Sequence, residues 1–111
     1  MPYLKLISLQ CKDTEDVTGA DETYLLIAGR RVWGPNSMND NDTADLTGMT
    51  PFRFNRSIRI ELYDQDAGWW DDDDFLGATF AYLSQMGTGE KEHTFTGDGA
   101  NYRLTYEVIR G

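Results

Sequence analysis

The amino-acid sequence predicts an all-β domain, an eight-stranded antiparallel β-sandwich. Two segments, 57–63 and 102–109, alternate between apolar and polar residues, and this period of two is typical of strands that bury one face. The other apolar segments are short and are separated by breaks rich in Gly, Asn and Asp. No segment has the apolar spacing of an amphipathic helix. Short strands without helices are typical of antiparallel sandwiches and barrels, and we expect the sandwich.

The two alternating segments define which residues face the core. The apolar face of 57–63 carries Ile58, Ile60 and Leu62. The apolar face of 102–109 carries Tyr102, Leu104, Tyr106 and Val108. Further strands are expected, in chain order, at 3–11, 23–28, 31–33, 52–54, 77–83 and 92–96.

Turn residues separate these strands. Glycines within 28–30 and 96–99 indicate tight turns, because glycine accepts the positive φ that such turns need. The stretch 34–48 is poor in apolar residues, so we expect an extended loop between the sheets, with room for a short strand near 44–46.

Composition indicates one folded domain spanning 1–111. The hydrophobic content of 40% argues against disorder. The formal net charge of −9 argues against a nucleic-acid partner, because phosphate binding requires clustered Lys and Arg. No Lys or Arg occurs between Arg59 and Lys91, whereas five arginines lie between positions 30 and 59. This asymmetry predicts a strongly negative pole and a more basic flank.

The cysteine count, the N-terminal residues and the length of the apolar runs indicate where the protein is expected to work. The one cysteine, Cys11, excludes an intrachain disulfide and is expected in the core. The N-terminal residues lack the pattern of a secretory signal, and no apolar run approaches the roughly 20 residues that span a bilayer. We expect a cytoplasmic protein by default, or a domain of a longer exported protein. The oligomeric state is left open, with a monomer as the default.

A loop with six aspartates follows the strand 57–63. Asp64, Asp66 and the run 71–74 supply these carboxylates within eleven residues. Such crowding opposes ionisation and folding unless a cation is bound. Calcium suits the loop best, because it accepts about 6–8 oxygen ligands in irregular geometry.

These residues resemble the C2 domain family. Asp64-Gln65-Asp66 at a strand end, followed by Asp74, two apolar residues and Gly77, is similar to the third calcium-binding loop of that family. The segment 19–25 resembles the family's entry to its second strand, with Glu22 and Thr23 in place of a proline, and 50–54 is similar to the Pro-x-x-aromatic approach to its central strands. The resemblance covers 4–80. It implies a C2-like Greek key that binds Ca²⁺ at one end and associates with membranes.

The expected metal ligands come from two facing loops. Alternate residues of an extended segment point the same way, so Asp64 and Asp66 are expected to hold one ion together. Loops at one end of a sandwich converge, so Asp21 and one of Asp13, Glu15 and Asp16 would complete the site. The loop is two residues longer than is usual in the family, so a neighbour in 71–73 could replace Asp74. The candidate ligands are Asp64, Asp66, Asp74, Asp72, Asp21, Glu15 and Asp16.

Other acidic residues are interpreted as solubilising surface residues. This group comprises Asp40, Asp42, Asp45, Glu90, Glu92 and Asp98. Trp69 and Trp70 are expected at the loop tip, where at least one would contact a membrane or partner protein. The alternative that Trp69 folds back over the aspartates stays open.

The sequence therefore predicts a calcium-binding C2-like module that associates with phospholipid or a protein when its acidic loops are loaded. Two alternatives remain. Calcium could merely stabilise a domain of a larger secreted or surface protein, or the acidic pole could inhibit a basic partner without any metal. An enzyme is not expected, because His93 lies in a strand without a nucleophile motif and no Gly-rich phosphate loop occurs.

Overall fold

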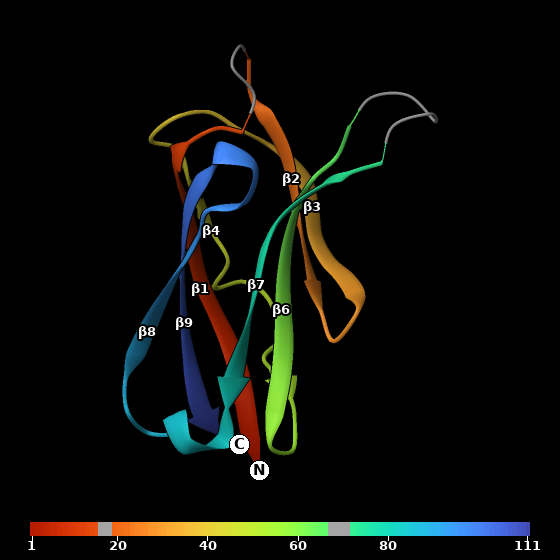
Figure 1. The fold of residues 1–111 in the computed structure, drawn as a ribbon. Coiled ribbons are helices and arrows are strands. Elements are labelled where there is room, and N and C mark those ends of the chain that lie inside the picture. The colour runs from red at the N-terminus through yellow and green to blue at the C-terminus, as the bar shows by residue number, and fades with distance from the viewer. Residues whose placement is uncertain (16–18, 67–71) are drawn as a thin grey trace.

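The computed structural model, which describes residues 1–15, 19–66 and 72–111, consists of two antiparallel β-sheets packed as a sandwich (Figure 1). Sheet A has the strand order β4-β1-β9-β8, with β5 also paired to β1, and sheet B has the order β3-β2-β6-β7. The strands are β1 (Pro2–Asp13), β2 (Asp21–Ile27), β3 (Arg30–Met38), β4 (Thr43–Asp45), β5 (Phe52–Arg53), β6 (Ser57–Asp64), β7 (Asp74–Tyr82), β8 (Glu90–Phe95) and β9 (Asn101–Arg110).

The all-β sandwich prediction is confirmed, although the described part of the chain holds nine strands rather than eight. Two short 3₁₀ turns, η1 (Leu83–Gln85) and η2 (Gly97–Gly99), follow β7 and β8. The expected turns at 28–30 and 96–99 join β2 to β3 and β8 to β9. Within the described residues, no helix is long and apolar enough to cross a membrane.

The core lies between the two sheets and contains the residues that alternation predicted. The apolar faces of β6 and β9 are buried. In β1 the buried positions change phase, because a register shift between Leu6 and Ser8 inserts Ile7 as an extra residue. Such a bulge lets Leu4 and Leu6 below it, and Leu9 and Cys11 above it, all face the core. Cys11 is buried there, and burial raises the pKa of its thiol to about 11.

Strand β3 is longer than the sequence predicted. The expected strand ended at Trp33, because the stretch 34–48 is poor in apolar residues and was expected to form an extended loop. Instead the register against β2 shifts between Thr23 and Leu25, and pairing resumes with Asn36 opposite Thr23. A Cβ at Gly34 would lie 2.3 Å from the carbonyl oxygen of Thr23, so only glycine permits this close approach of β3 to β2. The short strand expected near 44–46 is found as β4.

One end of the sandwich collects most of the acidic residues. We call this the acidic end: β1, β3, β6 and β8 finish there, and β2, β4, β7 and β9 begin there, at the top of Figure 1. Both termini lie at the opposite end, where the amide of Gly111 donates a hydrogen bond to the carbonyl of Met1 (Figure 1). The connecting sequences at the acidic end contain no Lys or Arg. The negative pole expected from the sequence therefore lies at this end.

Candidate metal centre

Carboxylates from β2, β6, β7 and the segments beside them converge at the acidic end. Glu15, Asp21 and Asp64 each offer a carboxylate oxygen, and these three oxygens lie within 4.8 Å of one another. Asp64, Asp66 and Asp74 form a second group with the same spacing. Asp64 belongs to both groups and so joins the two loops. Five of the candidate ligands from the sequence are thus brought together.

Asp21 is the first residue of β2 and is fully buried. Its Oδ2 accepts hydrogen bonds from the amide of Glu15 at 2.7 Å and from the hydroxyl of Tyr102 at 2.6 Å. Burial, and then the bond to Asp21, raise the pKa of Tyr102 well above its usual range. The Tyr102 hydroxyl therefore remains a donor at physiological pH and holds the Asp21 carboxylate in place.

Asp64 is the last residue of β6 and continues the buried series of Ile58, Ile60 and Leu62. Only 1% of its surface is exposed. It lies opposite Thr23 of β2 and opposite Asp74 of β7 in the ladder. Its Oδ1 accepts a hydrogen bond from the amide of Glu22 at 2.8 Å. The pairing of β6 with both neighbours thus fixes Asp64 between the two groups of carboxylates.

Asp73 braces the loop rather than joining the described clusters. Its Oδ2 accepts a hydrogen bond from the hydroxyl of Tyr24 at 2.5 Å, and its Oδ1 accepts one from the amide of Asp66 at 3.1 Å. Burial, followed by this bond, raises the pKa of Tyr24 to about 12, so Tyr24 stays a neutral donor. The Tyr24 ring stacks on Tyr63 with centroids 5.3 Å apart. Sheet B therefore positions Asp66 through Tyr24 and Asp73.

Asp98 also reaches the acidic end, although the sequence analysis interpreted it as a solubilising residue. It lies in η2, and its carboxylate oxygen lies within 4.8 Å of those of Glu15 and Asp74. A positive φ of 55° at Asp98 and the glycines on either side form this turn. The signal that the sequence analysis missed was the direction of β8. β8 runs toward the acidic end, so the β8–β9 connection lies at the same end as the β1–β2 and β6–β7 connections.

The other candidate residues stand apart from these groups or outside the described residues. Asp72 and Asp13 are exposed and belong to none of the three groups. Asp16, Trp69, Trp70 and Asp71 lie outside the described residues. Asp40 accepts a hydrogen bond from the amide of Thr14 at 3.0 Å, which ties the β3–β4 connection to the β1–β2 connection.

The donor set fits a hard cation. Every ligand atom in the three groups is a carboxylate oxygen, without nitrogen or sulfur, which matches Ca²⁺ or Mg²⁺ rather than zinc or copper. Two negative charges 4.8 Å apart repel by about 3 kcal/mol at an effective dielectric constant of about 20. Because Asp21 and Asp64 are buried, water screens this repulsion poorly. A divalent cation among these oxygens would turn repulsion into attraction.

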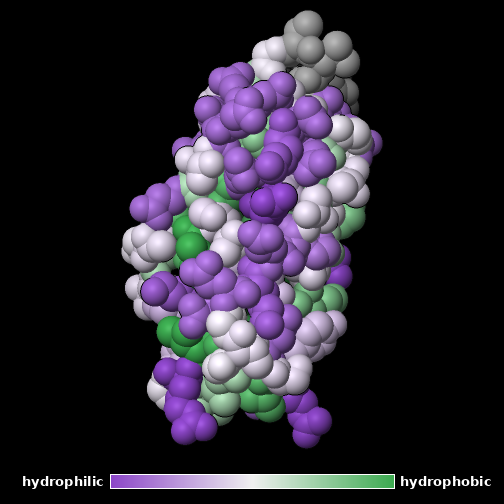
Figure 2. Space-filling view, turned by 90° about the vertical axis from the view of Figure 1, so that its left-hand side faces the viewer, coloured by the Kyte–Doolittle hydropathy of each residue, from purple (hydrophilic) through white to green (hydrophobic). Residues whose placement is uncertain are grey.

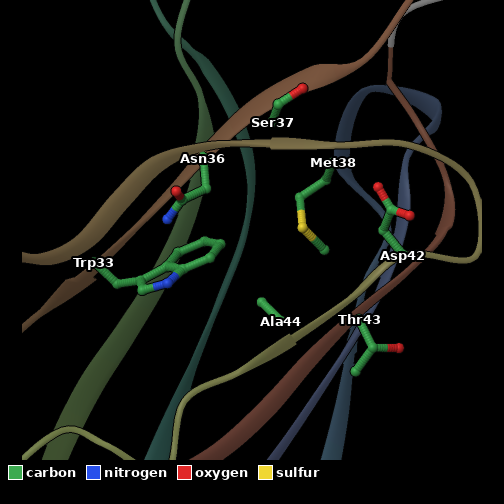
Figure 3. A pocket seen from close by; sticks show the side chains of 7 residues that line it. All are labelled: Trp33, Asn36, Ser37, Met38, Asp42, Thr43 and Ala44. Atoms are coloured by element: carbon green, nitrogen blue, oxygen red, sulfur yellow. The ribbon is translucent and has the colours of Figure 1, made fainter.

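A separate groove lies between β3 and β4, the edge strands of the two sheets (Figure 3). It has a volume of about 330 Å³. Trp33, Met38 and Ala44 point toward one another across it, and Asp42 lies at its rim (Figure 3). Asp42 belongs to none of the three carboxylate groups. The groove is therefore distinct from the candidate metal centre.

Comparison with known proteins identifies the fold. No protein-family model matches the sequence, and no curated protein matches it either. A solved C2 domain covers 97% of this chain and 98% of its own length, with 18% identity and a TM-score of 0.60. A C2 domain of plant extended synaptotagmin 1 covers 97% of this chain and 91% of its own, with 14% identity and a TM-score of 0.53. Human GIVD cytosolic phospholipase A2 matches 99% of this chain over 17% of its own, at 12% identity and a TM-score of 0.55.

Proposed function

This chain is a C2-fold domain, and on that premise we propose that its acidic end binds Ca²⁺ and, once loaded, associates with anionic phospholipid. The observation that carries the proposal is the position of Asp64, buried between two groups of carboxylates contributed by different loops. Solubility does not require carboxylates to be buried together, and burial without a cation opposes folding.

Five residues would hold the metal. Asp64 would be shared, with Glu15 and Asp21 on one side and Asp66 and Asp74 on the other. Bound calcium supplies positive charge that cancels the repulsion between these carboxylates. The protein's own contribution is to hold the oxygens in place, through Tyr102 acting on Asp21 and through Tyr24 and Asp73 acting on the backbone of Asp66.

Association with phospholipid follows from the same charges. The metal-free end carries several closely spaced negative charges and no Lys or Arg in its connecting sequences, so an anionic surface repels it. Neutralised by calcium, the end loses that barrier. Trp69 and Trp70, which lie outside the described residues, are proposed to contact the lipid interface. The similarity of fold to a C2 domain of an extended synaptotagmin supports this assignment.

Thermal unfolding tests the metal site. We expect graded calcium, but not millimolar magnesium, to raise the midpoint relative to chelator, with the concentration dependence of ligand linkage. The double variant Asp64→Asn with Asp66→Asn should lose the shift. Glu90→Gln with Glu92→Gln, which removes the same charge from exposed positions on β8, should keep it. An unchanged midpoint of the wild type at saturating calcium would overturn the proposal.

Vesicle binding separates the proposed function from its alternatives. We expect sedimentation with phosphatidylserine-containing vesicles in calcium, release by chelator, and loss on substituting Trp69 and Trp70 by alanine. A calcium-dependent midpoint without vesicle binding would instead favour a domain that calcium merely stabilises. Binding to basic proteins in chelator, weakened by salt, would favour the acidic inhibitor.

A further inference from the structure

We propose that β7 is a docking strand for a second copy of this chain, and that two copies pair antiparallel through β7 about a two-fold axis at Phe80. Sheet B would then continue across the dimer. The inference concerns a surface outside the metal centre and does not depend on calcium.

β7 is an edge strand of sheet B without the features that usually block strand pairing. Residues 75–83 contain no charged residue and no proline. Exposed edges are normally protected by charge, proline or short length. The other edges have such protection: β4 and β5 are three and two residues long, β3 contains Pro35 as well as Arg30 and Arg31, and β8 carries Glu90, Lys91 and Glu92. β7 alone among the described sheet edges is open to pairing.

β7 and the residue that follows it display an unusual share of exposed apolar surface. Among the described residues, the exposed large hydrophobic side chains besides Met1 all lie in 75–83: Phe75 at 47%, Phe80 at 38%, Tyr82 at 48% and Leu83 at 43%. Around β8, on the side shown in Figure 2, hydrophilic residues predominate and hydrophobic residues reach the surface as separate patches. An unprotected edge and exposed aromatic side chains thus coincide on one strand.

The turn η2 limits which part of β7 is accessible. A Cβ at Gly97 would lie 2.7 Å from the carbonyl oxygens of both Phe75 and Leu76, so η2 lies directly against the start of the strand. The segment from Ala78 to Tyr82 is the part of β7 beyond this contact. A pairing partner is therefore restricted to the second half of the strand.

Register within sheet B selects the two-fold axis. Ala78 lies opposite Glu61, Phe80 opposite Arg59 and Tyr82 opposite Ser57, all on the outer face of the sheet. Antiparallel pairing about Phe80 would set Phe80 against its own copy and Tyr82 against Ala78 of the partner, on that same face. The small Ala78 leaves space for the ring of Tyr82. The strand is therefore complementary to itself in this register.

Charge also favours a second copy in this orientation. Each chain carries a formal net charge of −9, with the acidic residues gathered at one end. Antiparallel pairing places the two acidic ends at opposite ends of the dimer, which keeps their repulsion small. Arg59 lies 5.7 Å from the centre of the Phe80 ring, and its charge is compensated by Glu61 at 3.2 Å. The interface itself would thus contain no uncompensated charge.

The expected affinity is modest. Stable interfaces bury about 800 Å² per partner. A pair of five-residue strands with their side chains falls at the low end of the range of interface areas. We therefore expect an equilibrium between monomer and dimer that depends on concentration. Sedimentation velocity of the full chain in chelator, from about 10 µM to about 1 mM, measures it directly.

Two variants define the expected result. Phe80→Lys adds charge at the axis and should leave the chain monomeric over the whole range. Thr94→Lys adds the same charge to an exposed position on β8 and should dimerise like the wild type. A wild-type chain that remains monomeric at 1 mM would overturn the proposal and leave β7 to an extended segment of another protein.

Disulfide trapping tests the register. In antiparallel pairs, directly opposed Cα atoms lie about 4.5–5.5 Å apart, within disulfide range. Phe80→Cys should therefore cross-link to its own copy when diamide is added as oxidant. Leu83→Cys, which is also exposed but lies three residues from the axis, should cross-link far less. The buried Cys11 does not compete. Equal cross-linking of both variants would contradict the axis at Phe80.

Discussion

Tyr102 of β9 donates a hydrogen bond of 2.6 Å to Asp21 at the start of β2, and so connects sheet A to sheet B beneath the acidic end. Both residues are fully buried. The contact links the core residue of one sheet to a candidate metal ligand of the other. Stability and metal affinity should therefore respond together when it is removed.

Tyr102→Phe should lower the free energy of unfolding by about 1.5–3 kcal/mol, the usual contribution of a hydrogen bond to a charged group. It should also weaken calcium binding several-fold, because Asp21 loses a positioning contact. Tyr106→Phe is the matched control, since its hydroxyl contacts the neutral Gln85 at 3.1 Å from the same strand. Urea unfolding in chelator and calcium titration by calorimetry measure both effects. Equal losses in the two variants would argue against a special role for Tyr102.

Asp64→Asn should stabilise the metal-free protein, because it removes a buried negative charge from two groups of carboxylates while its amide oxygen can still accept from Glu22. We expect a gain of about 1 kcal/mol or more in chelator, from the repulsion of about 3 kcal/mol per pair. Asp45→Asn should instead be slightly destabilising, because hydrogen bonds from Thr47 lower the pKa of Asp45 and favour its ionised form. Urea unfolding of both variants decides the point. A loss of stability in Asp64→Asn would show that the hydrogen bond to the charged carboxylate outweighs the repulsion at this residue.

Gly34→Ala should be strongly destabilising. The added Cβ would meet the carbonyl oxygen of Thr23 at 2.3 Å, and φ is +86°. Gly29→Ala is a useful control, since φ is +81° but no atom lies within 4 Å. We expect about 1 kcal/mol for the control from backbone conformation, and at least about 2 kcal/mol more for Gly34→Ala. Similar unfolding midpoints would mean that the backbones of β3 and β2 do not approach each other this closely in solution.

Alkaline pH should destabilise the protein through Cys11. Burial raises the pKa of the thiol from 9.0 to about 11, so the folded state keeps its proton where the unfolded chain has lost it. The stabilisation is complete below about pH 9 and is lost as pH rises toward 11, by up to about 3 kcal/mol for two units. Cys11→Ala should flatten this part of the curve of unfolding free energy against pH. A slope unchanged by the substitution would assign the alkaline loss to the tyrosines instead.

The alternation of apolar and polar residues is a local pattern, so it predicts the features of the fold that depend on residues close together in the sequence. Asp64 follows Ile58, Ile60 and Leu62 at the same parity, so the pattern that predicts a buried face also directs this carboxylate inward. Strand β3 was predicted too short, because the polar stretch that begins at Gly34 was interpreted as a loop. What keeps β3 in the sheet is the close approach of the β2 backbone, which no local pattern reveals.

In the candidate metal site, too, some residues could be predicted from the sequence and others are brought together only by the fold. Glu15 and Asp21 are six residues apart, and their association followed from spacing and family resemblance. Asp98 lies 24 residues beyond Asp74, and only the paths of β7 and β8 bring them together. Its neighbours Gly97 and Gly99 predict a turn but not the end of the molecule at which the turn lies.

The separation of charge along the molecule affects how it meets a surface. The sandwich is 41 Å in its longest dimension, with the acidic residues at one end and Arg53 and Arg110 beside the first residues of β1 at the other. Such a molecule has a large electric dipole moment, so a charged surface exerts a torque on it as well as a force. Near an anionic surface, the metal-free domain would turn its arginine-bearing end forward. Cations held among the carboxylates would reduce that torque, so cation binding would change the orientation in which the domain first meets the surface.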